Sequence, residues 1–359
     1  MTRAVVAHIH RDAFVHNLQC VRDAAPGVKV LAVIKADGYG HGSVRAARAL
    51  AGADAFGVHC LEEALQLRAA GIVQPIVVLA GFFHADELPV MVRERLTAVV
   101  HHPFQIEALS LFDSGEAKLD VWLKVDSGMH RLGFAMSMAV EAWQRLRACK
   151  SVNGPLCVMT HLACADEPDN PMTGEQIRRF ERLMQAIPAP RSIANSAGVL
   201  RWPQSHGDWV RPGLMLYGIS PFGPQVGVGG MLRPVMTLTA PVHTVNYLKK
   251  GDPVGYGAAW VCPVDMAVGV VAIGYGDGYP RHVEPGTPVL LRGRRVPIIG
   301  RVSMDSLFID LSDIPDCRIG ERVTLWGEGM PIEEVAHAAG TIPYELTCQL
   351  TGRVRFVVE

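Results

Sequence analysis

The first two-thirds of the chain alternates short apolar runs with amphipathic segments, a pattern that predicts repeated strand–helix units. Eight apolar runs are predicted as strands: Lys29–Lys35, Ala55–Val58, Ile76–Ala80, Leu96–Val100, Leu119–Val125, Leu156–Leu162, Ser192–Ala194 and Asp208–Val210. Between them, segments such as SVRAARALA and GEQIRRFERLMQAI carry apolar residues at the three-to-four spacing of helices. Strands that are apolar on both faces are typical of parallel sheets covered by helices. The pattern therefore predicts an α/β fold, a (β/α)8 barrel of the TIM type, with an open doubly wound sheet as the alternative.

The pattern changes after residues 218–234, GISPFGPQVGVGGMLRP, where glycine and proline recur every few positions. Such a segment is typical of a domain boundary. Beyond it, the sequence predicts short strands and one short helix, at Val235–Val245, Met266–Ile273, Thr287–Leu291, Val323–Leu325 and, for the helix, Pro331–Ala339. We therefore expect a barrel over residues 1–225 and a mainly β C-terminal domain over residues 226–359. This division leaves room for the first few residues to pack with the second domain.

Composition narrows the classes of protein that the chain can belong to. Of its 359 residues, 49% are hydrophobic and 19% charged, which excludes intrinsic disorder. The net charge of −1 and the absence of a basic run argue against a nucleic-acid partner. No apolar run has the length of a membrane span and no secretory signal is visible, so we expect a cytoplasmic protein. The eight cysteines form no C-x-x-C pair and the histidines lack ligand spacing, so we expect free thiols and no metal.

Lys35 is the first candidate for chemistry. It closes the apolar run VLAVI and opens the loop ADGYGHG. At the carboxyl end of a barrel strand, its side chain would point into the mouth where barrel enzymes have their active sites. Partial desolvation there lowers the pKa of a lysine and favours Schiff-base formation. A lysine that merely extends from a strand end into solvent is the alternative, and the residues alone leave both open.

The segment AVIKADGYGHG resembles the pyridoxal-phosphate attachment motif of alanine racemases. The resemblance continues, in family order from residue 32 to residue 348, through LKVDSGMHRLGF, MTHLACADE, IANSAG, VRPGLMLYG, VGYGAAW, AIGYGDGYPR, IIGRVSMD and IPYELTC. It implies a barrel followed by a β-domain, a homodimer and pyridoxal 5′-phosphate as cofactor. The implied reaction is the interconversion of L- and D-alanine by two-base proton transfer at Cα, which either supplies D-alanine for peptidoglycan or consumes it.

The resemblance also implies the catalytic groups. Lys35 would hold the cofactor and serve as the base on the face that handles D-alanine. Tyr256 would act on the opposite face, from the partner subunit. His161 and Arg211 would be the nearby cations that lower the pKa of this phenol. Arg211 would also face the pyridine nitrogen, which it cannot protonate because a guanidinium holds its proton too tightly.

Further residues are implied for binding. The phosphate would be held by Tyr39, Ser196, Tyr344 and the backbone amides of Gly213 and Leu214.

Arg131 would contact the phenolic oxygen of the cofactor and the substrate carboxylate, a task suited to a guanidinium fork. The Met304 amide of the partner subunit would complete the carboxylate contact. Lys124 matches a lysine that is often carbamylated in the family, and the carbamate would position Arg131.

Three related readings remain alternatives. A broader-specificity amino-acid racemase on the same fold is typically exported, which the missing signal sequence disfavours. A decarboxylase would place an acid at the pyridine nitrogen, where this chain has Arg211. A non-catalytic pyridoxal-phosphate-binding protein resembles the barrel alone, without a domain that carries Tyr256 and Met304.

Overall fold

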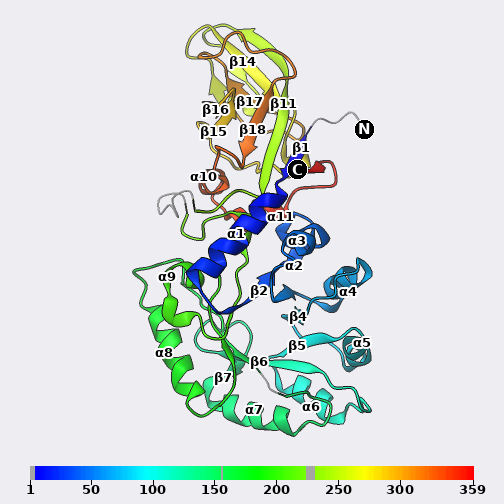
Figure 1. Ribbon diagram of the computed structural model, residues 1–359. Coiled ribbons are helices and arrows are strands. Elements are labelled where there is room, and N and C mark those ends of the chain that lie inside the picture. The colour runs from blue at the N-terminus through cyan, green and yellow to red at the C-terminus, as the bar shows by residue number, and fades with distance from the viewer. Residues whose placement is uncertain (1–4, 155–156, 224–230) are drawn as a thin grey trace. The chain divides into compact units, whose positions relative to one another are not determined.

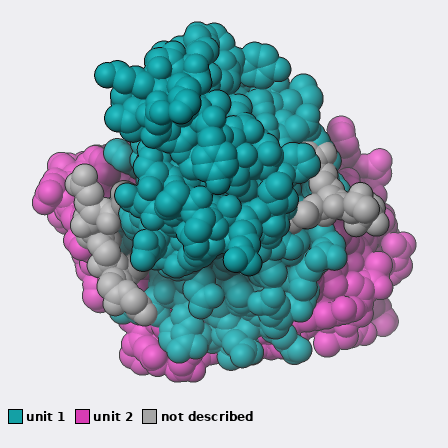
Figure 2. Space-filling view, turned by 90° about the horizontal axis from the view of Figure 1, so that it is seen from above, with its two compact units in different colours: residues 1–16, 217–359 teal, residues 17–216 magenta. Residues whose placement is uncertain are grey.

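The computed structural model describes residues 5–154, 157–223 and 231–359. The chain forms two compact units, one of residues 17–216 and one of residues 1–16 together with 217–359 (Figure 2). The boundary expected between residues 225 and 226 falls in 224–230, outside the described residues.

Residues 17–216 form a closed barrel of eight parallel strands (Figure 1). In spatial order these are β5 (Leu96–Val100), β4 (Ile76–Val78), β3 (Ala55–Val58), β2 (Lys29–Val33), β10 (Trp209–Val210), β9 (Arg191–Ser192), β8 (Cys157–Met159) and β6 (Asp120–Asp126). The pairing of β5 with β6 closes the ring, and β7 (Phe134–Ala135) adds a short strand beside β6. The predicted TIM-type barrel is thus confirmed, and each of its strands overlaps a predicted run.

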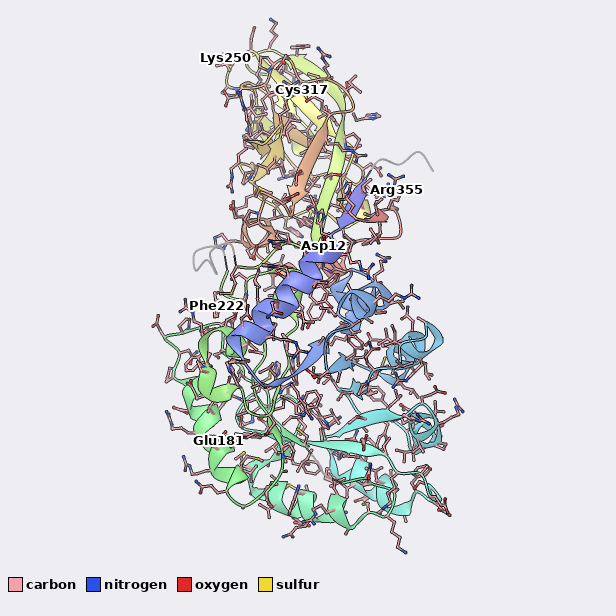
Figure 3. All side chains as sticks on the ribbon, in the orientation of Figure 1. Asp12, Glu181, Phe222, Lys250, Cys317 and Arg355 are labelled. Carbon is pink, nitrogen blue, oxygen red and sulfur yellow. The ribbon has the colours of Figure 1, made fainter. Side chains whose placement is uncertain are left out.

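The barrel strands are linked by helices whose buried residues recur at helical spacing. These helices are α3 (Ser43–Ala49), α4 (Leu61–Ala69), α5 (Leu88–Arg93), α6 (Pro103–Leu111), α7 (Ala139–Ala148), α8 (Met172–Met184) and α9 (Ser196–Arg201), after α1 (Arg11–Ala24) at the start of the chain. Three-residue 3-10 turns are η1 (Ala85–Glu87), η2 (Met136–Met138) and η3 (Pro203–Ser205). In α8, Ile177, Phe180 and Leu183 are buried. Its polar face carries Glu181 (Figure 3), which accepts a hydrogen bond from Arg191.

The second unit contains an eight-stranded sheet, in spatial order β14 (Met266–Val271), β17 (Leu307–Asp310), β16 (Arg294–Ile299), β15 (Pro288–Leu291), β18 (Arg322–Trp326), β11 (Met236–Leu248), β1 (Val6–Ile9) and β19 (Arg355–Val358). β11 pairs with both β14 and β18, which closes six of these strands into a ring. The N-terminal strand β1 pairs with β11 and β19, so the first residues belong to this sheet. The predicted mainly β domain is confirmed.

The smaller elements of this unit are the hairpin β12 (Pro253–Val254) and β13 (Trp260–Val261), the helices α10 (Ile332–Ala338) and α11 (Pro343–Cys348), and the 3-10 turns η5 (Tyr256–Ala258) and η6 (Tyr275–Asp277). A further 3-10 turn, η4 (Leu214–Tyr217), begins in the barrel unit and ends with the first residue after it. No helix in the described part of the chain is long and apolar enough to cross a membrane.

Candidate active site

Lys35 follows β2 and begins a left-handed turn, the segment labelled α2 (Lys35–Tyr39). Five consecutive residues, 36–40, have φ between 48° and 76°. Three of them, Ala36, Asp37 and Tyr39, are not glycine, and each costs about 1–2 kcal/mol in this conformation. Such strain persists only where the surroundings impose it, and it concentrates at functional sites. The turn therefore marks the end of β2 as a candidate site.

Four cations gather at the carboxyl ends of the barrel strands. Lys124, on β6, is buried, and its pKa is lowered to about 8 by burial and by the nearby charges of Arg211, Arg131 and Lys35. A pocket at the ends of β6 and β8 is lined by Lys124, Arg131 and His161, among others. A group of positive charges at the mouth of a pocket attracts anionic ligands.

The loop that carries Arg131 is shaped by Asp126, the last residue of β6. Its Oδ1 atom accepts hydrogen bonds from the amides of Gly128, at 2.8 Å, and His130, at 3.1 Å. His130 takes a left-handed φ of 57° directly before Arg131. The carboxylate thus fixes the path of the backbone into Arg131.

Arg211 follows β10 and is buried, with 4% of its surface exposed. Its Nη1 atom donates to Ser192 Oγ at 2.7 Å, and Nη2 donates to the carbonyl oxygens of Thr160, at 2.6 Å, and Ile193, at 3.2 Å. Burial lowers the pKa of Arg211 to about 10. The guanidinium is therefore still charged at neutral pH and is fixed by acceptors from β8 and β9.

His161 follows Thr160 at the end of β8, and its Nδ1 atom accepts from Arg211 Nη2 at 3.3 Å. Because a guanidinium only donates, this contact requires an unprotonated Nδ1. Burial lowers the pKa of His161 well below 6.5, and the charges of Arg211, Lys124 and Arg131 lower it further. The expectation of a cationic His161 is therefore wrong: the ring is neutral, and Arg211 supplies the charge in this pair.

A candidate anion site, called the anion cradle below, lies at the ends of β9 and β10. Ser196 opens α9, and its Oγ atom accepts from the amides of Gly213, at 3.0 Å, and Met215, at 3.3 Å. A Cβ atom on Gly213 would lie 2.4 Å from Tyr39 Oη, so only glycine allows the phenol this close. Leu214 begins η4 directly after this glycine. Backbone amides, a serine and a tyrosine that converge in this way suit a phosphate group.

Three of the residues implied by the resemblance lie in the other unit. Tyr256 begins η5 between Gly255 and Gly257, both at left-handed φ, and 71% of its surface is exposed. Met304 lies in a loop and is 51% exposed, and its backbone carbonyl oxygen accepts a hydrogen bond from the Gly276 amide at 2.9 Å. Tyr344 lies in the first turn of α11 and is partly exposed. The side chains of all three residues are therefore at least partly exposed on the surface of this chain.

The structure adds polar residues that the sequence analysis did not select. Ser192 receives a bond from Arg211, and Gln176 is fully buried on α8. Gln176 Nε2 donates to His161 O at 3.0 Å, and Gln176 Oε1 accepts from the Ala163 amide at 2.8 Å. The sequence signal that could have identified Gln176 is a polar residue on the apolar face of a helix, because a buried amide side chain needs hydrogen-bond partners.

Among the described residues, no cluster of three or more His, Cys, Asp or Glu side chains could hold a metal ion.

Comparison with known proteins decides the family. The family models for the N-terminal and the C-terminal domains of alanine racemase match residues 9–221 and 235–358. The chain belongs to the alanine racemase family. It is therefore an enzyme, an isomerase, as the sequence motifs implied.

Individual relatives cover the whole chain. The alanine racemase of Aliivibrio salmonicida is 50% identical over 352 residues, which make up 98% of each chain. The crystal structure of the biosynthetic alanine racemase from Pseudomonas aeruginosa matches with a TM-score of 0.95 and 42% identity, covering 100% of both chains. The alanine racemase from Bartonella henselae was solved with covalently bound pyridoxal phosphate. It matches with a TM-score of 0.89 and 29% identity over 99% of both chains.

Proposed function

We propose that this chain interconverts L- and D-alanine as a cytoplasmic homodimer, with pyridoxal phosphate held by Lys35 and with Tyr256 supplied by the second copy. The observation that carries the proposal is the group of four cations beside the anion cradle at the mouth of the barrel. This donor set fits a cofactor that has a phosphate, a ring nitrogen and an aldehyde for a lysine. When bound to an amino acid, pyridoxal phosphate withdraws electrons from Cα and makes its proton removable.

The phosphate would lie in the cradle of Ser196, Tyr39 and the Gly213 and Leu214 amides, with Tyr344 as a further donor. The Gly213 amide donates to Ser196 Oγ at 3.0 Å, which brings the two groups together and leaves the serine hydroxyl able to donate its own hydrogen to the phosphate. The carboxyl ends of late barrel strands are common positions for phosphate.

Arg211 would face the pyridine nitrogen. With its pKa at about 10, Arg211 keeps its proton near neutral pH and leaves the ring nitrogen unprotonated. Opposite Arg211, the bound cofactor would be a weaker electron sink than one held opposite an acid, which would restrict side reactions such as transamination.

Arg131 would bind the substrate carboxylate together with the partner's Met304 amide, and Lys124 would orient Arg131. A lysine with a pKa of about 8 has a substantial fraction of neutral amine near pH 7.5, and the neutral form is the one that reacts with carbon dioxide. We propose that Lys124 is carbamylated. The modification would replace a repelling cation beside Arg131 with an anion that pairs with it.

Proton transfer needs one base on each face of Cα. Lys35 would serve as the base on one face and Tyr256 on the other. A phenol with an ordinary pKa of about 10 needs a nearby cation to act as a base at neutral pH. Because His161 is neutral, Arg211 is the buried cation in this pair that can supply the positive field.

The test of the reaction is the optical rotation of L-alanine solutions with purified protein and pyridoxal phosphate. We expect decay to zero rotation with the wild type and with Lys118→Ala, an exposed control lysine, and no decay with Lys35→Ala. Rotation that decays with lysine, arginine or serine but not with alanine would establish a broader-specificity racemase instead. Rotation that stays constant with all four amino acids would contradict racemisation.

Mixing variants tests the shared site. In a mixed dimer of Lys35→Ala and Tyr256→Phe, one site would have both defects and the other would have neither. Random pairing at equal amounts should therefore restore about a quarter of wild-type activity. Activity that stays at the level of the separate variants would place both bases on one chain.

A further inference from the structure

We propose that Glu63 is a positioning residue for Lys35, whose carboxylate holds the left-handed turn in the orientation that aims the lysine at the cofactor. The inference rests on the proposed role of Lys35. Glu63 touches neither substrate nor cofactor in this account, and it acts through the backbone next to Lys35.

The contacts place Glu63 between two strand ends. It lies in the first turn of α4, after the N-cap residue Cys60. Its Oε1 atom accepts a hydrogen bond from the Ala36 amide at 2.7 Å, and Oε2 accepts from the His59 amide at 2.6 Å. Both bonds are short, as expected for a charged acceptor. One carboxylate thus ties the residue after Lys35 to the residue after β3.

The turn also has clamps of its own. Asp37 Oδ1 accepts from the Ser43 amide at 2.8 Å. His41 Nδ1 lies 3.1 Å from the carbonyl oxygen of Gly38 and 2.8 Å from that of Tyr39. These contacts join neighbours in sequence and keep the turn left-handed. They do not fix its orientation against the rest of the barrel.

Glu63 supplies that orientation because it comes from the next strand–helix unit. The turn carries two proposed cofactor contacts, Lys35 at one end and Tyr39 at the other. A rotation of the turn as a body would displace both, and a misplacement of about 1 Å can reduce a rate about a hundredfold. The bond at Ala36 resists this rotation next to the lysine.

Glu63→Gln tests the inference with little change in shape. The two amides of Ala36 and His59 need two acceptors, whereas a carboxamide has one acceptor oxygen and turns donor hydrogens toward the second amide. Glu62→Gln is the matched control. Glu62 is the preceding residue in the same helical turn, it is exposed, and its carboxylate interacts with Cys60.

Two measurements decide the inference. The first is hydrogen–deuterium exchange of the peptide spanning residues 35–43 in cofactor-free protein. The second is the rate at which added pyridoxal phosphate becomes trapped on Lys35 by borohydride, located by peptide mass. We expect Glu63→Gln to speed exchange of this peptide about tenfold and to slow trapping about tenfold, while Glu62→Gln matches the wild type and all three proteins melt within a few degrees of one another.

Each outcome is decisive. Exchange or trapping in Glu63→Gln equal to that in Glu62→Gln would overturn the positioning role. Faster exchange across the whole barrel with a lowered melting temperature would also overturn it, in favour of a general structural role. Failure of the wild type to trap the cofactor on Lys35 would overturn the proposed function, whereas the exchange measurement would still report on the clamp.

Discussion

Acidification should destabilise the barrel through His41, which lies directly after the left-handed turn. The side chain is 1% exposed, and the carbonyl oxygens of Gly38 and Tyr39 near Nδ1 require that this atom carry the proton of the neutral ring. Burial lowers the pKa of His41 to about 4, against the favourable effect of these two carbonyls. The charge of Arg45 lowers the pKa further, and that of Asp37 raises it.

The direction and size of this pH effect follow from the pKa of His41 in the unfolded and the folded protein. Unfolded histidine has a pKa of about 6.5, so above that pH both states are neutral and His41 contributes no pH dependence. Between pH 6.5 and about 4, the unfolded state binds the proton and the folded state does not. Stability therefore falls as the pH falls, by about 1.4 kcal/mol per pH unit. The loss amounts to about 2 kcal/mol at pH 5 and about 3 kcal/mol near pH 4.

The assay is urea unfolding of cofactor-free protein, followed by circular dichroism between pH 7 and pH 5. His41→Gln has no titrating ring, so its stability should fall by about 2 kcal/mol less than that of the wild type over this interval. His282→Gln, at an exposed position in the other unit, is the control. The acid sensitivity of buried His161 is present in all three proteins and cancels from the comparison. Parallel pH profiles for His41→Gln and the wild type would refute the reasoning.

Two further substitutions test the site. Gly213→Ala would place a methyl group 2.4 Å from Tyr39 Oη, and such overpacking costs about 1–3 kcal/mol, so pyridoxal phosphate should bind roughly 5- to 150-fold more weakly by fluorescence titration. Gly154→Ala, at a position with open space, is the control, and equal affinities for the two variants would contradict the cradle. Gln176→Leu would leave the His161 carbonyl and a neighbouring amide without their partner. This substitution should lower the free energy of unfolding, measured in urea, by about 2–5 kcal/mol and should change kcat more than KM. Wild-type stability and kinetics would show that the two hydrogen bonds of Gln176 have no role.

The barrel could be predicted from sequence because its parallel strands are apolar on both faces and are separated by amphipathic helices. The buried run Leu96–Val100 illustrates the first feature and α8 the second. The β-rich unit was predicted less completely. The strand Arg294–Ile299 contains Pro297, and a proline within a run argues against a strand, yet here it pairs with Pro288 in β15. The sequence allowed the first few residues to pack with the second domain but did not predict the strand Val6–Ile9, because its partners are more than 200 residues away along the chain.

For the candidate site, the motifs indicated Lys35, Arg131 and Arg211 as candidates, but local sequence could not give their electrostatics. Whether a histidine is charged depends on burial and on neighbours contributed by other strands, as the neutral His161 shows. The left-handed turn was equally hidden, since Ala36 does not favour that conformation by itself. Its geometry is imposed by contacts that form only after folding.

The grouping of cations in the barrel has a consequence for the order of assembly. Lys124, Arg131 and Arg211 repel one another, and the pKa of Lys124 is lowered by burial and then by the charges of these arginines. A bound phosphate adds nearly two negative charges near the cluster, and a carbamate on Lys124 would convert one cation into an anion. Both changes remove repulsion that the protein without cofactor must bear. Binding and modification should therefore oppose each other, because each removes positive charge that favours the other. The left-handed turn, neutral His161 and buried Arg211 are all in place before the cofactor binds. The barrel therefore holds a positively charged site that is already arranged for an anionic cofactor.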